Sequence, residues 1–157
     1  MESVTEKRVA LLHPTLRAEL AEIIANIESK GIDIRITQGL RTIAEQDAIY
    51  AQGRTKPGKV VSNAKGGQSF HNYGLAVDFC LYHSDGSISF GMHDDMNKDG
   101  KADWMQVVDS FKSFGWEWGD RGYVDTPHFQ KVFGKTPEYY FSCAKDAEGY
   151  PILEEVS

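Results

Sequence analysis

Two short segments, fifty residues apart, together contain the residue types of a metal site. His71 and Asp78 lie seven positions apart at the start of an alternating apolar run, and the segment 125–128 adds Asp125 and His128. Two imidazoles and one carboxylate are the usual protein ligands of a catalytic zinc ion. If His71, Asp78 and His128 share one zinc ion, the fold must bring these segments into contact. Asp125 then remains as a carboxylate beside the metal, placed to act as a general base.

The spacing of these residues constrains the local backbone. A separation of seven places two side chains on opposite faces of a straight strand, so the chain must bend between His71 and Asp78. The segment 72–74, Asn-Tyr-Gly, supplies a plausible bend. Pro127 holds the residue before it in an extended conformation, so we expect 125–128 to form a non-helical turn. A zinc ion there would lower the pKa of a bound water from about 15.7 toward about 7.

Hydrophobic periodicity predicts an α+β fold. Apolar residues at helical spacing, with capping residues at their ends, predict helices at 14–30, 42–52 and 104–114. Alternating apolar residues and turn signals predict strands at 32–36, 75–81, 87–90, 116–118 and 128–132. We therefore expect a small, mostly antiparallel sheet that carries the zinc site, with helices packed on it. Residues 54–70 are typical of a long loop, and the tail from 136 onward receives no prediction.

Composition narrows the class of protein. A chain of 157 residues with 41% apolar content suits one compact core, so we expect residues 1–157 to form a single domain without a separate binding module. No apolar run approaches the roughly 18 residues that a membrane-spanning helix needs, so we expect no membrane insertion. A net charge of −6 without a Lys/Arg stripe argues against a nucleic-acid partner. Cys80 and Cys143 are expected to be reduced and packed.

A second metal-type pattern precedes the predicted helix at 104–114. Residues 95–103 have the pattern D-x-N-x-D-G-x-x-D, which matches positions 1, 3, 5, 6 and 9 of a calcium loop of EF-hand type. Gln106 stands where such loops place a bidentate glutamate, which should weaken calcium binding. The alternative is an acidic, solvated turn. We expect a structural or regulatory calcium ion bound by Asp95, Asn97, Asp99, Lys101 and Asp103.

The motif S-x-H-x-x-G-x-A-x-D at 69–78, followed by D-x-x-H at 125–128, resembles a known family of zinc peptidases. That family includes D-alanyl-D-alanine carboxypeptidases and L-alanyl-D-glutamate endopeptidases. The endopeptidase branch, found in bacteriophage endolysins and bacterial cell-wall hydrolases, is the better match. Segments 36–55, 66–74 and 115–130 support that branch. The fold implied is that of the hedgehog and D-Ala-D-Ala peptidase domains.

The resemblance assigns a role to each residue of the predicted site. It implies zinc ligands at His71, Asp78 and His128, with Asp125 as the catalytic base where carboxypeptidases more often have glutamate. It also implies that Arg41 stabilises the oxyanion, a role in which a fixed cation contributes strongly. Without the resemblance, a structural ion pair would be the preferred interpretation of Arg41.

Three further residues are candidate substrate contacts on the same basis. They are Ser69, Gln46 and Tyr50, and the alternatives are bracing of the loop for Ser69 and packing for the other two. The implied function is a zinc-dependent endopeptidase that hydrolyses the L-alanyl-D-glutamate bond of peptidoglycan stem peptides and lyses bacterial cells. The alternatives are a D,D-carboxypeptidase or dipeptidase acting on D-Ala-D-Ala, and a zinc-stabilised binding domain without catalysis. The presence of Asp125 and Arg41 argues against the last.

The N-terminus bears on the route to the wall. Residues 1–8 are polar and include acids, so they make a poor signal peptide. By analogy with single-domain endolysins, we expect a monomer that is made in the host cytoplasm, acts on the cell wall and depends on a holin-type partner for release.

Overall fold

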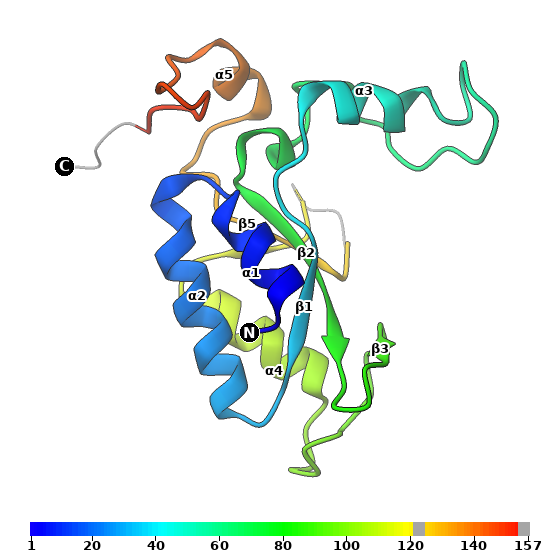
Figure 1. Ribbon diagram of the computed structural model, residues 1–157, viewed down its shortest axis with the longest axis vertical. Helices are drawn as coiled ribbons and strands as arrows, with labels where there is room; N and C mark the ends of the chain where they lie inside the picture. The colour runs from blue at the N-terminus through cyan, green and yellow to red at the C-terminus, as the bar shows by residue number, and fades with distance from the viewer. Residues whose placement is uncertain (121–124, 154–157) are drawn as a thin grey trace.

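A small antiparallel sheet forms the centre of the molecule (Figure 1). The computed structural model describes residues 1–120 and 125–153. Within them the strand order is β1-β2-β5-β4, and β3 pairs with the C-terminal end of β2. The strands are β1 (Ile34–Gln38), β2 (Ala76–Tyr82), β3 (Ile88–Ser89), β4 (Glu117–Trp118) and β5 (His128–Gln130). All pairings are antiparallel, and the predicted α+β class is confirmed.

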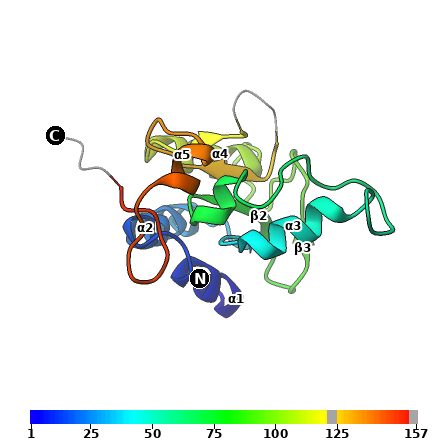
Figure 2. The same cartoon turned by 90° about the horizontal axis from the view of Figure 1, so that it is seen from above.

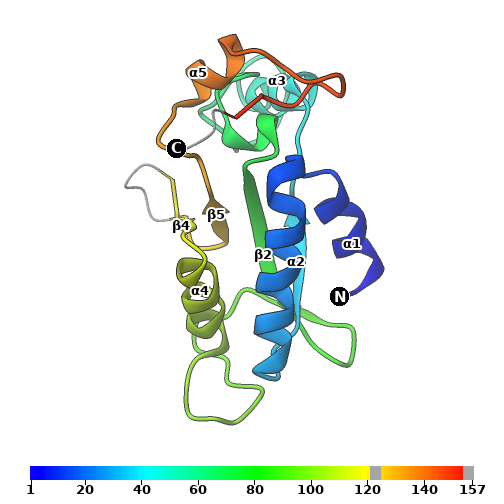
Figure 3. The ribbon, with the colours of Figure 1, turned by 90° about the vertical axis from the view of Figure 1, so that its left-hand side faces the viewer.

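Helices surround this sheet and extend it at one end. They are α1 (Ser3–Ala10), α2 (Pro14–Ser29), α3 (Ile43–Ala51), α4 (Asp103–Ser113) and α5 (Pro137–Ser142), with a 3₁₀ helix η1 (Phe70–Tyr73). Figure 3 shows α1, α2 and α4 running alongside the strands, whereas α3, α5 and η1 gather at one end. The loop that follows α3 projects sideways from the body (Figure 2). No helix among the described residues is long and apolar enough to cross a membrane.

The helix α2 forms where its sequence predicts it. Pro14 occupies its first turn, and the His13 side chain accepts a hydrogen bond from the Thr15 backbone N–H at 3.2 Å. Gly31, with φ +77°, follows its end. One face of the helix is buried, and burial of each such aliphatic side chain contributes about 1.5–3 kcal/mol. The buried residues are Leu16, Leu20, Ile23, Ile24 and Ile27.

An aromatic cluster packs α4 against one face of the sheet and leaves the opposite face for the predicted metal ligands. Phe111 of α4 stacks on Phe129 of β5 at 4.1 Å between ring centroids, and Phe79 of β2 lies 5.6 Å from Phe129. All three side chains are fully buried. Because side chains alternate along a strand, the neighbours Asp78 and His128 point to the opposite face. The register pairs Asp78 directly with His128, so the two strands bring these residues together.

Several elements differ from the sequence predictions. The first strand is Ile34–Gln38 rather than 32–36, and the last predicted strand ends at Gln130. Helices α1 and α5 were not predicted. Residues 54–69 contain no helix or strand, which agrees with the predicted loop. Cys80 is buried, Cys143 is half-buried and both are free thiols, as expected.

Candidate metal centre and catalytic cleft

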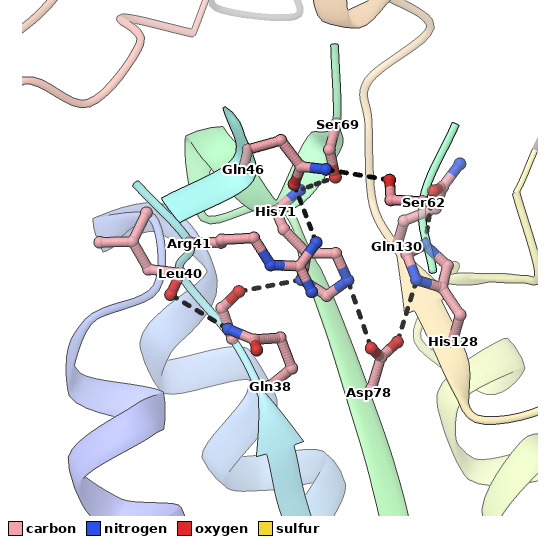
Figure 4. A network of polar contacts seen from close by, with 11 residues as sticks. Gln38, Leu40, Arg41, Gln46, Ser62, Ser69, His71, Asp78, His128 and Gln130 are labelled. Carbon is pink, nitrogen blue, oxygen red and sulfur yellow. Dashed lines mark hydrogen bonds and ion pairs between the residues drawn. The ribbon is translucent and has the colours of Figure 1, made fainter. Parts of the chain in front are cut away.

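The three predicted zinc ligands meet at one point above the sheet (Figure 4). Nε2 of His71 lies 3.6 Å from Oδ2 of Asp78, and Nδ1 of His128 lies 3.1 Å from Oδ1 of the same carboxylate. One ligand atom from each residue lies within 4.8 Å of the other two. Both imidazoles are buried, whereas the carboxylate is partly open to solvent. The sequence therefore identified side chains that the fold brings together.

This arrangement fits a zinc ion. Zinc bonds of roughly 2.0–2.2 Å in a tetrahedron separate neighbouring ligand atoms by about 3.3–3.6 Å. The nitrogens of His71 and His128 lie 3.6 Å and 3.1 Å from the two oxygens of Asp78, and one ligand atom from each residue lies within 4.8 Å of the others, so small side-chain adjustments would place all three on one ion. Burial raises the pKa of Asp78, but the hydrogen bonds and charges of His128 and His71 outweigh it and hold that pKa well below its usual range. Asp78 is therefore ionised at neutral pH, as a zinc ligand must be. Three protein ligands leave the fourth position open, as in catalytic zinc sites.

A short 3₁₀ turn places His71 beside the strand. The Ser69 hydroxyl accepts a hydrogen bond from the His71 backbone N–H at 3.2 Å, and the Asn72 side chain accepts from the Ser69 N–H at 3.3 Å. Gly74 then takes φ +70°, where a Cβ would lie 2.5 Å from the backbone nitrogen of His13. Only glycine fits at that bend. The predicted change of direction between His71 and the strand is thus present.

Each histidine is held through the ring nitrogen that does not face Asp78. His71 donates from Nδ1 to the Gly39 carbonyl at 2.9 Å, because a carbonyl can only accept. His128 places Nε2 2.8 Å from Oε1 of the Gln130 side chain. Such partners orient metal-binding imidazoles and fix which nitrogen carries the proton. Burial lowers the pKa of His128, but the hydrogen bond and charge of Asp78 more than offset this and raise it overall.

Arg41 enters the same site from the chain after β1. Its backbone N–H donates to the His71 carbonyl at 2.9 Å, and its guanidinium donates to Oε1 of Gln46 at 2.8 Å (Figure 4). Burial lowers the pKa of Arg41, with Asp78 and Glu45 opposing, yet arginine stays charged in proteins. Among the described residues no carboxylate lies within ion-pair distance of this guanidinium. The structure therefore does not support the alternative of a structural ion pair.

Asp125 lies in the same cleft as the three ligands. The backbone N–H of His128 donates to the Asp125 carbonyl at 3.0 Å, which closes the turn predicted around Pro127. Burial, followed by the negative charge of Asp78, raises the pKa of Asp125 above its usual value. A carboxylate with a raised pKa accepts a proton more readily, which suits a general base that later acts as an acid.

The cleft has a volume of about 870 Å³, enough for several residues of a peptide. Gln46 and Ser69 lie in its wall, but Gln46 is fully buried and its amide donates to the Ser62 hydroxyl at 3.1 Å and to the Ala64 carbonyl at 2.8 Å. Tyr50 is absent from the described lining. Lining residues that the sequence did not single out are Ile49, Val61, Ser62, Asn63, Ala64, Gln68, Asp120 and Glu138.

Tyr50 packs against the guanidinium of Arg54, whose Cζ lies 3.8 Å from the centroid of the Tyr50 ring. Its predicted role as a substrate contact therefore stays a prediction, as do the roles of Gln46 and Ser69. Residues 61–64 of the loop after α3 form part of the cleft wall. No short sequence motif within that loop predicts this position.

The predicted calcium loop lies at the opposite end of the sheet from α3 (Figure 1). Asp95 accepts hydrogen bonds from the backbone N–H of Asp99 at 3.2 Å and of Gly100 at 3.0 Å. Oδ2 of Asp103 accepts from the Met96 N–H at 2.9 Å, whereas its Oδ1 is buried and has no hydrogen-bond partner. Within residues 1–120 and 125–153, the only cluster of three or more metal-binding side chains is the histidine-aspartate site.

A sheet that presents two imidazoles and an ionised carboxylate in an open cleft, beside a second carboxylate and an arginine, defines a zinc hydrolase. The chain matches the D-alanyl-D-alanine carboxypeptidase family over residues 62–131. The peptidoglycan L-alanyl-D-glutamate endopeptidase CwlK of Bacillus subtilis (strain 168) is 46% identical over 123 residues, covering 77% of this chain and 74% of that protein. The chain therefore belongs to the zinc peptidase family of D-alanyl-D-alanine carboxypeptidases and L-alanyl-D-glutamate endopeptidases, as its motif indicated.

Two solved structures share the fold. The L-Ala D-Glu endopeptidase ChiX of Serratia marcescens has a TM-score of 0.55 at 20% identity, over 85% of this chain and 90% of that one. The L,D-carboxypeptidase DacB from Streptococcus pneumonia has a TM-score of 0.53 at 22% identity, over 77% of this chain and 66% of that one. At these identities the likeness concerns the fold alone. The protein is a metallopeptidase, and its fold is that of its family.

Proposed function

We propose that this protein is a peptidoglycan endopeptidase that hydrolyses the L-alanyl-D-glutamate bond of the stem peptide. The observation that carries the proposal is the 46% identity to a relative that bears this activity in its name. The site supports it, because the zinc ligands, Asp125 and Arg41 all line one cleft of peptide size. The same machinery suits a D,D-carboxypeptidase, so the identity of the bond is the point to test.

The residues of the cleft divide the work of hydrolysis. Zinc bound by His71, Asp78 and His128 would supply a Lewis acid that activates water and polarises the scissile carbonyl. Asp125 takes a proton from the attacking water while the water oxygen bonds to the carbonyl carbon. The guanidinium of Arg41 faces the negative charge that develops on the carbonyl oxygen. As the carbon–nitrogen bond breaks, Asp125 returns the proton to the departing amine.

Mass analysis of digested muropeptides tests which bond is cut. We expect new C-terminal L-alanine on the glycan side and new N-terminal glutamate on the released peptide. Removal of zinc by a chelator should abolish these products, and added zinc should restore them, because the proposed hydrolysis depends on the metal as its Lewis acid. Release of terminal D-alanine would instead establish the D,D-carboxypeptidase. Zinc binding without any product would establish a non-catalytic domain.

We further propose that the protein acts as an endolysin. The support is chemical: cleavage of stem peptides removes the cross-links that give the wall its strength. A monomer added to cells with a permeabilised outer membrane should clear them, and the Asp125→Asn and Asp125→Ala variants should not. A holin-type partner is proposed by analogy. Co-expression with a holin should then be needed for lysis from within, and prompt lysis without one would contradict that part.

We also propose that the loop at 95–103 binds calcium. Its support is the EF-hand pattern, the turn that Asp95 closes, and the buried, unpaired Oδ1 of Asp103. Asn97 donates through its amide nitrogen to the Lys30 carbonyl at 2.8 Å, which turns its Oδ1 into the loop, where that oxygen accepts from the Asp99 N–H at 3.4 Å. The Lys101 N–H donates to Asp99 at 2.9 Å within the same turn.

Calorimetric titration of calcium into zinc-loaded protein tests this loop. Binding heat should be present, and Asp95→Asn should remove it, because that substitution discards the ionised carboxylate at position 1 of the loop. Asp85→Asn, in an exposed turn outside the loop, is the matched control and should bind as the parent does. Absence of heat, together with equal activity in calcium and in a calcium chelator, would show that the loop is only a solvated turn.

A further inference from the structure

Gln130 is a fully buried side chain that contacts a metal ligand. It lies two residues after His128 on β5, so both side chains point to the same face of the sheet. Its Oε1 lies 2.8 Å from Nε2 of His128 (Figure 4), and its amide nitrogen donates to Glu117 at 3.1 Å and to Asp120 at 3.3 Å. The strand register pairs Gln130 directly with Glu117.

The two carboxylates determine which way the Gln130 amide points. A carboxylate can only accept hydrogen bonds, so the NH₂ group of the amide must face Glu117 and Asp120. The amide oxygen must then face His128, although the two ends of an amide are otherwise hard to tell apart. An oxygen in that place requires His128 to carry a proton on Nε2. The lone pair that binds a metal is therefore left on Nδ1, the nitrogen that faces Asp78.

We propose that Gln130 is a positioning residue that holds His128 in the orientation and tautomer that zinc requires, and that Glu117 and Asp120 hold Gln130 in turn. The ring of His71 is held in the same way by its hydrogen bond to the backbone carbonyl of Gly39, which no side-chain substitution removes. The orientation of His128 depends on a side chain and is therefore open to mutation. Partners of this kind change metal affinity by about 10–100-fold.

The first test asks which ring nitrogen of each histidine binds zinc, and it needs no substitution. The proposal predicts opposite nitrogens in His71 and His128. Long-range ¹H–¹⁵N correlation spectra of the zinc-loaded protein report which imidazole nitrogen is protonated. We expect zinc on Nδ1 and a proton on Nε2 for His128, and the reverse for His71. Zinc on Nε2 of His128 would overturn the proposal, because Gln130 would then face the metal-binding nitrogen.

Zinc affinity, measured by chelator competition, is the second test. Gln130→Met keeps the length and burial of the side chain. It removes both the oxygen that faces His128 and the NH₂ group that donates to Glu117 and Asp120. We expect zinc to bind this variant about 10–100-fold more weakly, with the metal-free protein still unfolding cooperatively. Zinc affinity equal to that of the parent would show that Gln130 only fills space. This readout does not depend on which peptide bond the enzyme cuts.

An exchange of partners separates positioning from packing. The triple variant Glu117→Gln, Asp120→Asn, Gln130→Glu places a carboxylate against Nε2–H of His128 and amides at positions 117 and 120 to hold it. The change at position 120 is needed because the Asp120 carboxylate lies 3.3 Å from the Gln130 amide nitrogen and would repel a carboxylate there. We expect the triple variant to bind zinc more tightly than Gln130→Met. A folded triple variant as weak as Gln130→Met would overturn the proposal.

Discussion

Replacement of Asp125 by asparagine is expected to slow peptide hydrolysis by about two to four orders of magnitude while zinc binding remains intact. Asparagine matches the shape of aspartate but cannot accept a proton from water. General base catalysis contributes about 10²–10⁴-fold, so kcat should fall by that factor with KM little changed. Asp125 is not one of the three clustered ligands, so zinc content should stay at one ion per chain. Muropeptide turnover and zinc analysis of the same preparation measure both quantities.

Asp125→Ala should behave as the asparagine variant does, whereas Asp125→Glu keeps a carboxylate and should retain part of the activity. The pH profile gives an independent check. Burial and the charge of Asp78 raise the pKa of Asp125, and the base works only when it is ionised. Activity should therefore be present above that pKa and lost as the pH falls through it. A fully active Asp125→Asn enzyme would remove Asp125 from the mechanism.

Features set by local interactions were predictable from the sequence. The capping box of Thr42 and Glu45 is present, with both hydrogen bonds at 3.0 Å, because it involves residues three positions apart. The bend at Gly74 was predictable because glycine readily adopts the positive φ found there, whereas its close approach to the His13 backbone is a tertiary contact. The helix α1 escaped prediction because the Glu2 carboxylate caps it, at 3.0 Å from the Val4 N–H, and glutamate is not a preferred capping residue.

The candidate site was predictable where its residues carry the chemistry themselves. His71, Asp78 and His128 are recognisable by type and spacing, although fifty residues separate the last two. Gln130 was not recognisable, since a glutamine has many uses. Its role depends on the pairing of β5 with β4, which sets it against Glu117, a tertiary fact that no local pattern contains.

The second large effect is expected at Arg41. Arg41→Met keeps the length of the side chain but removes its charge and the hydrogen bond to Gln46. Loss of one group that stabilises an oxyanion costs about 10²–10³-fold in kcat, because the charge it opposes develops only in the transition state. KM and zinc content should change little, since Arg41 is not a ligand. Steady-state kinetics on a defined stem peptide measure the two constants separately.

Two comparisons show whether the guanidinium itself is responsible. Arg41→Lys keeps a charge but loses the planar fork that bonds Gln46 while facing the substrate, so it should recover only part of the rate. Arg17→Met is the matched control, because Arg17 lies on α2 outside the described cleft lining and should keep parental activity. If Arg41→Met instead raised KM and left kcat unchanged, Arg41 would bind the ground state and the transition state equally. The oxyanion would then depend on the metal alone.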